Sequence, residues 1–218
     1  VNILNGFDKK EIAVIGDFML DRYFVGNAER ISPEAPVPVV LISEEKSTLG
    51  GAGNVVENLN SLGVKVDPYG IIGNDNNGDE LLAKLKLENI DISHLLLCNK
   101  KKTTVKTRII ADKQQMLRYD IELIEPLSEE LEKKIIEQLG RNIERYDAII
   151  LSDYAKGVFS NNLAPQIIQL ATKNHKKVIA DPKPINIEKF IGATAITPNL
   201  KEAALVLNKT TAKTTDDI

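Results

Sequence analysis

Residues 11–17, Glu-Ile-Ala-Val-Ile-Gly-Asp, form an apolar run that ends in a polar corner. The run has no polar face, which is typical of a strand inside a parallel sheet covered on both sides. Gly16 and Asp17 then place a carboxylate where the strand ends. Because ligands of open α/β sheets bind at the carboxyl ends of the strands, Asp17 is the first candidate binding residue.

The chain after this strand alternates between helical and strand-like segments. Residues 54–62 have apolar positions at helical spacing and stop at Gly63, and residues 64–72 return to a strand pattern. Further helices are expected at 74–88, 127–143, 161–174 and 199–207, and further strands at 147–152, 177–180 and 193–197. Repeated strand–helix units predict an α/β fold with a mainly parallel sheet sandwiched by helices.

Two segments interrupt this alternation. Residues 36–43 and 103–119 are rich in β-branched side chains, and a strand–helix unit separates them. Thr104, Lys106 and Arg108 alternate with the β-branched residues between them, which indicates a half-exposed sheet. We expect a small antiparallel sheet that projects from the main domain as a β lid, spanning about residues 22–48 and 103–120.

The composition is that of an ordinary globular protein. Of 218 residues, 43% are hydrophobic and 27% are charged, and the net charge is −3. No long basic run is present, so a nucleic-acid partner is not expected. The first residues lack the pattern of a signal peptide, and no apolar window approaches the roughly 18 to 20 residues that span a bilayer. With Cys98 as the only cysteine, we expect a cytoplasmic protein without a membrane partner.

Four polar groups follow strands of the predicted sheet and should therefore meet at one edge of it. They are Asp17 with Asp21, the segment 152–157 (Ser-Asp-Tyr-Ala-Lys-Gly), the segment 181–183 (Asp-Pro-Lys) and the segment 197–202 (Thr-Pro-Asn-Leu-Lys-Glu). An aspartate after a strand is also a common helix or turn cap, so each group alone has a structural explanation. Their convergence favours a binding site.

A glycine-rich segment opens the helix expected at 54–62, and it reads Gly-Gly-Ala-Gly-Asn over residues 50–54. Glycines at a helix start let backbone N–H groups approach a ligand oxygen; a tight connection from the small sheet is the structural alternative. A dinucleotide-binding loop is excluded by position, because it would follow the first strand directly. The phosphate-loop pattern G-x-x-x-x-G-K-[ST] is absent from the sequence.

Residues 50–54, followed by 61–63 (Ser-Leu-Gly) and 70–75 (Gly-Ile-Ile-Gly-Asn-Asp), resemble the N-terminal signature of the ribokinase-like (PfkB) carbohydrate kinases. Residues 16–23 (Gly-Asp-Phe-Met-Leu-Asp-Arg-Tyr) and 30–39 (Arg-Ile-Ser-Pro-Glu-Ala-Pro-Val-Pro-Val) are similar to the heptose 7-phosphate kinases within that family. The segments 151–157, 181–183 and 197–200 fit the same group. The resemblance covers nearly the whole chain and implies the ribokinase-like fold.

The resemblance implies ATP-dependent phosphorylation of D-glycero-β-D-manno-heptose 7-phosphate at the anomeric position, in the pathway to ADP-heptose and the lipopolysaccharide core. It makes Asp17 an acceptor for sugar hydroxyls, which suits an ionised carboxylate because that group only accepts. Asp21 is expected to be a second acceptor or a cap. The other residues expected at the sugar phosphate are Gly50, Gly51, Gly53, Asn54, Asp153 and Lys156, with Arg108 and Arg118 as a clamp for its phosphate.

The same resemblance places ATP and Mg²⁺ near the segment 197–202. Asn199 and Glu202 match the family's Asn-x-x-Glu motif and lie one turn apart on one helix face. They are expected to hold Mg²⁺ near the ATP phosphates, with Glu202 acting through water. A helix cap made by the same two residues is the structural alternative. Leu200, Lys201 and Lys183 complete the expected ATP-binding set.

The family's catalytic base is an aspartate in a Gly-Ala-Gly-Asp segment that also supplies the anion hole. In this sequence the only Gly-Ala-Gly, residues 51–53, is followed by Asn54. We therefore expect residues 1–218 to be an incomplete kinase domain without a catalytic residue, which stops as a helix begins near Thr214. The resemblance also implies a homodimer through the lid. The alternatives are a non-catalytic dimerisation or scaffold module and a PfkB-family kinase for another sugar.

Overall fold

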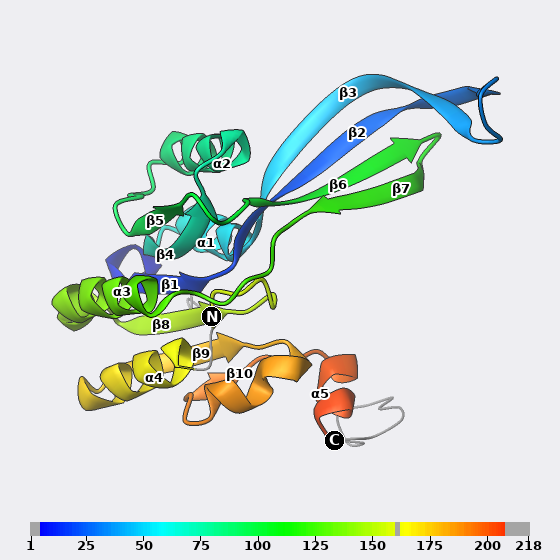
Figure 1. The fold of residues 1–218 in the computed structure, drawn as a ribbon. Helices are drawn as coiled ribbons and strands as arrows, with labels where there is room; N and C mark the ends of the chain where they lie inside the picture. The colour runs from blue at the N-terminus through cyan, green and yellow to red at the C-terminus, as the bar shows by residue number, and fades with distance from the viewer. Residues whose placement is uncertain (1–4, 160–161, 208–218) are drawn as a thin grey trace.

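The computed structural model describes residues 5–159 and 162–207, and within these ranges the chain forms two sheets (Figure 1). The larger sheet has the strand order β10-β9-β8-β1-β4-β5, and each of its pairings is parallel. Its strands are β1 (Glu11–Gly16), β4 (Lys65–Gly73), β5 (Leu95–Cys98), β8 (Ala148–Ser152), β9 (Lys177–Asp181) and β10 (Ala195–Ile196). The predicted α/β fold with a mainly parallel sheet is confirmed.

Helices lie on both faces of this sheet around β1 and β4. The helices are α1 (Ala52–Ser61), α2 (Asn76–Leu87), α3 (Glu129–Asn142), α4 (Leu163–Lys173) and α5 (Leu200–Val206), and three 3₁₀ turns lie at η1 (Phe7–Lys9), η2 (Ile143–Arg145) and η3 (Pro184–Phe190). Successive β1 residues enter opposite cores: Ala13 and Ile15 pack with the α3 and α4 side, and Val14 packs with the α1 and α2 side. This double burial explains the continuous apolar run.

The second sheet has the order β3-β2-β6-β7 and projects from the main domain (Figure 1). Its strands are β2 (Phe18–Ile31), β3 (Pro38–Gly51), β6 (Thr104–Ala111) and β7 (Gln114–Ile121). We call this sheet the lid. It is mixed and not antiparallel as expected, because β2 and β6 pair in parallel between two antiparallel hairpins. Both strands leave the main domain in the same direction, which imposes that pairing.

Most predicted helices and strands are found within two residues of their expected ends. The α2 helix begins after Asp75, whose side chain accepts a hydrogen bond from the Gly78 N–H, and α3 begins after Ser128, which accepts one from Leu131. The sequence reading missed β5 and the length of β2. Cys98 is half-buried at the end of β5. The helix start expected near Thr214 lies outside the described residues. No helix in the described part of the chain is long and apolar enough to cross a membrane.

Candidate functional site

The four predicted polar groups lie in a row along the carboxyl edge of the main sheet. Strands β10, β9, β8 and β1 are neighbours in that order, and the groups follow their ends in turn. Gly16 pairs with Ser152 and Ser152 with Asp181, so the strand ends are level. The lid begins at the same edge, because β2 starts immediately after Asp17. The structure therefore brings the predicted groups to one edge of the sheet, with Asp17 and Asp21 at the base of the lid.

Asp17 holds the loop that follows β8. Its side chain is 2% exposed, and it accepts hydrogen bonds from the backbone N–H groups of Tyr154 (2.8 Å), Lys156 (3.1 Å) and Val158 (3.2 Å). Burial raises the pKa of Asp17 above its ordinary value, although these N–H donors act in the opposite direction. Contact between Asp17 and sugar hydroxyls stays a prediction. In this structure its oxygens organise residues 154–158.

Asp153 has a similar position. It is 1% exposed, and its carboxylate accepts hydrogen bonds from the Ala155 N–H (2.7 Å), the Lys183 N–H (3.1 Å) and the Asn186 side chain (2.9 Å). These contacts tie the loop after β8 to the segment after β9. Direct contact between Asp153 and substrate stays a prediction, and the observed contacts give it a positioning role.

Asp21 is a half-buried acidic side chain at the base of the lid. It lies in β2, where Arg108 Nη1 in β6 donates to its Oδ1 at 2.5 Å. Its Oδ2 lies over Gly50, and a Cβ atom on Gly50 would be only 2.3 Å from that oxygen. Glycine at position 50 thus leaves the space that the carboxylate occupies. Asp21 combines partial exposure, a positioned carboxylate and a neighbouring cation, which suits binding of hydroxyl groups.

The other two glycines of residues 50–54 allow a close turn and close packing at the start of α1. Gly51 has a φ of +58°, and a Cβ there would lie 2.3 Å from the Asp17 carbonyl oxygen, so the close turn into α1 requires glycine. Gly53 packs against Leu49, where a Cβ would lie 3.2 Å from the leucine Cβ. Asn54 is exposed on the first turn of α1.

The predicted basic residues are mostly paired with carboxylates. Lys156 binds Glu122 at 2.7 Å, Arg118 binds Asp120 at 2.6 Å, and Lys183 binds Glu202 at 2.8 Å. Arg118 is exposed on β7 and engages both oxygens of Asp120. The expected clamp of Arg108 and Arg118 is therefore occupied by protein carboxylates in this structure.

Two residues of the site, Tyr154 and Lys106, were given no binding role from the sequence. Tyr154, in the loop after β8, has the Lys106 ammonium 5.3 Å from its ring centroid, and the Lys183 ammonium is also 5.3 Å away. Lys106 was recognised as a lid residue and was not assigned to the site. The sequence did contain a signal for Lys106. Residues two apart share a face of a strand, so Lys106 should lie on the same face of β6 as Arg108, which had been assigned to the site.

Asn199 and Glu202 form the capping box of α5. The Asn199 side chain accepts a hydrogen bond from the Glu202 N–H, and Glu202 accepts one from the Asn199 N–H, both at 3.0 Å. Glu202 also binds Lys183, which lowers the pKa of its carboxyl group. Leu200 is half-buried and Lys201 is exposed. The helix cap that was the alternative interpretation of Asn199 and Glu202 is thus present, and it does not exclude a role of these residues near ATP.

The acidic residues near the ends of β9 and β10, Asp181 and Glu202, suit a Mg²⁺ ion bound through water better than one bound directly. No group of three or more His, Cys, Asp or Glu residues is arranged to hold a metal ion within residues 5–159 and 162–207. Burial raises the pKa of Asp181, with smaller contributions from Glu202 and Asp153, whereas the Thr197 hydroxyl and Lys183 act in the opposite direction. Mg²⁺ retains several waters and needs few protein carboxylates when phosphates supply the other ligands. Glu202 and Asp181 fit that chemistry.

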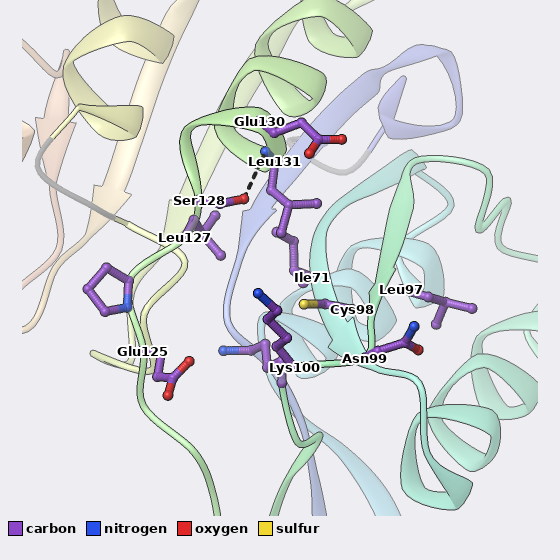
Figure 2. A pocket seen from close by; sticks show the side chains of 12 residues that line it. Ile71, Leu97, Cys98, Asn99, Lys100, Glu125, Leu127, Ser128, Glu130 and Leu131 are labelled. Atoms are coloured by element: carbon purple, nitrogen blue, oxygen red, sulfur yellow. Dashed lines mark hydrogen bonds between the residues drawn. The ribbon is translucent and has the colours of Figure 1, made fainter.

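A cavity of about 560 Å³ lies beside this row and not on it (Figure 2). It is bounded by the end of β5 and the residues leading into α3, including Ile71, Cys98, Lys101, Glu125 and Leu131. Figure 2 shows Cys98 next to Ile71 and Asn99 on its wall. The cavity mixes acidic, basic and apolar residues. The candidate site is therefore defined by the polar row and the lid.

Comparisons with known proteins agree with this geometry. The family model described as "pfkB family carbohydrate kinase" matches residues 9–218. "Bifunctional protein HldE" of Aliarcobacter butzleri is 50% identical over 200 residues, which are 92% of this chain and 42% of that protein. The protein of the same name from Sulfurimonas denitrificans is 48% identical over 93% of this chain and 42% of its own length. The chain thus spans about two fifths of these relatives.

Solved structures share the fold at low sequence identity. A tetrameric inhibited form of phosphofructokinase-2 from Escherichia coli superposes with a TM-score of 0.73 at 18% identity, covering 95% of this chain and 66% of that chain. A putative ribokinase from Agrobacterium tumefaciens gives a TM-score of 0.70 at 20% identity, covering 95% of this chain and 64% of that one. At these identities the likeness concerns the fold alone.

Proposed function

This chain belongs to the PfkB family of carbohydrate kinases, and we propose that it is the sugar-binding part of a kinase for D-glycero-β-D-manno-heptose 7-phosphate. The observation that carries the proposal is the placement of Asp21, which is held by Arg108 over Gly50 at the base of a lid rich in cations. The relatives named HldE, at 48–50% identity, support the heptose substrate. The product would be the 1,7-bisphosphate, an intermediate on the way to ADP-heptose and lipopolysaccharide core.

Each part of the site has a distinct task in this proposal. Asp21 accepts hydrogen bonds from sugar hydroxyls, and its ion pair with Arg108 holds the carboxylate in place. Asp17 and Asp153 hold the loop that carries Tyr154. The lid begins at the same edge and would keep water from the bound sugar. Lys183 and Glu202, with Asp181 nearby, form the side where the ATP phosphates and Mg²⁺ would bind.

Phosphoryl transfer requires the sugar's anomeric hydroxyl to attack the γ-phosphorus of ATP, so that ADP leaves and the hydroxyl proton passes to a base. When bound, Mg²⁺ neutralises the phosphate charge. The family's base is the aspartate of Gly-Ala-Gly-Asp, and the 218 residues contain no such segment. A positioned base contributes about 10²- to 10⁴-fold to rate. We infer that these 218 residues bind the sugar phosphate without phosphorylating it.

Assembly and location follow from the same proposal. The lid face opposite Asp21 exposes Leu117, Tyr119 and Ile121, and a small sheet with an uncovered apolar face is marginal in water. We propose that two lids pack against each other in a homodimer. A cytoplasmic location follows from the use of ATP and a phosphorylated sugar.

The proposal is tested by titration calorimetry of the 218-residue chain with a panel of sugars. We expect measurable binding of heptose 7-phosphate and at least about tenfold weaker binding of fructose 6-phosphate and ribose. An ADP-release assay with Mg-ATP should show no turnover. Tighter binding of fructose 6-phosphate would favour a kinase for another sugar, and binding of no sugar would favour a scaffold module. ADP release dependent on heptose 7-phosphate would show that the base lies within the chain.

A further inference from the structure

The lid face that carries Asp21 holds several charged side chains from three strands. Asp21 in β2 and Lys106 in β6 are register partners, and Lys106 is in turn the partner of Asp120 in β7. Arg108 and Arg118 are also paired across β6 and β7. Residues opposite each other in neighbouring strands, and residues two apart in one strand, project from the same face. These five side chains therefore share the face that meets the loop carrying Tyr154.

Three of the four cations around this face are neutralised by a carboxylate. The ion pairs are Arg108 with Asp21 at 2.5 Å, Arg118 with Asp120 at 2.6 Å, and Lys156 with Glu122 at 2.7 Å. A ligand anion could recruit one of these cations only by competing with its protein carboxylate. Such competition weakens the net gain from the new contact, because one ion pair replaces another.

Lys106 is the exception. It is half-buried, and it forms no ion pair with any carboxylate in residues 5–159 or 162–207. Its ammonium lies 5.3 Å from the centroid of the Tyr154 ring, a contact that orients the group without neutralising it. Burial lowers the pKa of Lys106, and Arg118 and Lys156 lower it further, against the opposing effects of Asp21 and Asp120. Lys106 thus keeps its positive charge without a carboxylate in ion-pair contact.

We propose that Lys106 binds the phosphate group that the sugar already carries, so that it selects phosphorylated over unphosphorylated sugars. This inference rests on the proposed function, since it concerns the same substrate. Asp21 and Lys106 sit on adjacent strands about 5 Å apart, so one ligand can offer hydroxyls to the carboxylate and a phosphate to the ammonium. The phosphate would then bind at a lid residue, whereas the Lys183 and Glu202 pair on the proposed ATP side belongs to the segment after β9 and to α5.

The test is calorimetry of the 218-residue chain with heptose 7-phosphate and with unphosphorylated heptose. Lys106→Met should weaken binding of the phosphate ester by about 10- to 100-fold, the effect of losing one charge-assisted contact. It should leave the affinity for unphosphorylated heptose unchanged. Lys106→Arg keeps the charge and should stay within about threefold of the wild type. Lys46→Met is the matched control, because Lys46 is an exposed lid lysine that forms no ion pair with a described residue.

Each other outcome overturns the inference in a recognisable way. Unchanged heptose 7-phosphate affinity in Lys106→Met, beside normal wild-type binding, refutes the role of Lys106 and leaves the proposed function intact. An equal loss for both sugars, or an equal loss in Lys46→Met, shows that the lysine acts through structure or general charge. Failure of the wild type to bind either sugar removes the proposed function itself. Thermal unfolding of each variant confirms that the folded protein is compared.

Discussion

At the scale of single residues, the site separates into carboxylates that hold the protein together and one that remains available to a ligand. Asp17 and Asp153 are almost fully buried and bind backbone N–H groups, whereas Asp21 is half-buried beside Arg108. All three follow or lie near strand ends, so their sequence context is alike. Their difference arises from the loop after β8, which folds over two of them.

Asp21→Asn is predicted to lower affinity for heptose 7-phosphate by about 10- to 100-fold, because the amide is a weaker acceptor and loses its ion pair with Arg108. The unfolding free energy should change by less than about 1 kcal/mol, as expected for a partly exposed pair. Asp120→Asn, which breaks the exposed pair with Arg118 on the same lid face, is the control. Equal losses of affinity in the two variants would contradict the assignment.

Asp17→Ala is predicted to destabilise the protein by about 2 to 4 kcal/mol. The substitution leaves three N–H groups of residues 154–158 without their acceptor in a buried site. Urea unfolding followed by circular dichroism measures the change. If stability is retained while sugar affinity falls, Asp17 contacts the sugar directly, as the family resemblance implied.

Sequence reasoning located these residues but did not assign their partners. The run Glu11–Gly16 and its following acid were enough to place Asp17 at the sheet edge. Which N–H groups Asp17 accepts from depends on the path of residues 153–158, and Ala155 in that loop adopts a positive φ of 55° that no motif announces. Arg118 was expected in a phosphate clamp, but its side chain binds Asp120. The sequence did not reveal this pairing because it requires the strand conformation of β7.

At the scale of elements, the junction of β3 and α1 positions the site. β3 ends at Gly51 and α1 begins at Ala52 without an intervening loop, so the backbone turns sharply between the lid and the main domain. The glycine-rich pattern predicted a helix start here. The pattern did not show that Gly50 makes room for Asp21, since that contact joins neighbouring strands of the lid.

Gly50→Ala is predicted to weaken binding of heptose 7-phosphate by about tenfold or more, because the new Cβ would lie 2.3 Å from Asp21 Oδ2 and must displace that carboxylate. Gly140→Ala in α3 is the matched control. A Cβ there meets only Leu170 Cδ2 at 3.9 Å, so alanine should stabilise the helix by about 0.5 to 1 kcal/mol and leave binding unchanged. Calorimetry and thermal unfolding read the two effects. Unaltered binding in Gly50→Ala would mean that Asp21 does not bind the sugar where it stands.

The lid shows the limit of pattern reading for whole elements. Residues 103–119 were recognised as strands, but β2 was not predicted at its full length because its mixed sequence, Phe18–Ile31, shows no sustained alternation. Its strand conformation depends on β3 and β6, which flank it along most of its length. Such dependence on distant partners is a general property of strands. It also explains why the parallel pairing of β2 and β6 was not expected.

At the scale of the whole molecule, the main domain and the lid present different surfaces. Helices pack against both faces of the parallel sheet around β1, whereas the lid extends away from it (Figure 1) and exposes apolar side chains of β7. A second lid is the partner that we propose for this face.

Leu117→Glu is predicted to convert the homodimer into a monomer, because it places a charge in the proposed apolar contact between lids. Leu117 is 53% exposed in the isolated chain, and Leu62, at the end of α1, is 47% exposed and provides the control variant Leu62→Glu. Sedimentation velocity at tens of micromolar distinguishes the two species. A wild-type chain that is monomeric at this concentration would contradict the dimer.

The central claim is that this chain binds a phosphorylated sugar where the lid meets the carboxyl edge of the sheet. The most direct measurement is a backbone-amide NMR titration of the 24.1 kDa chain with heptose 7-phosphate. The account predicts that the shifted amides cluster at residues 20–23, 48–54, 104–108 and 154–158. Shifts confined to the cavity walls formed by residues 97–101 and 125–131, or the absence of shifts at saturating ligand, would contradict it.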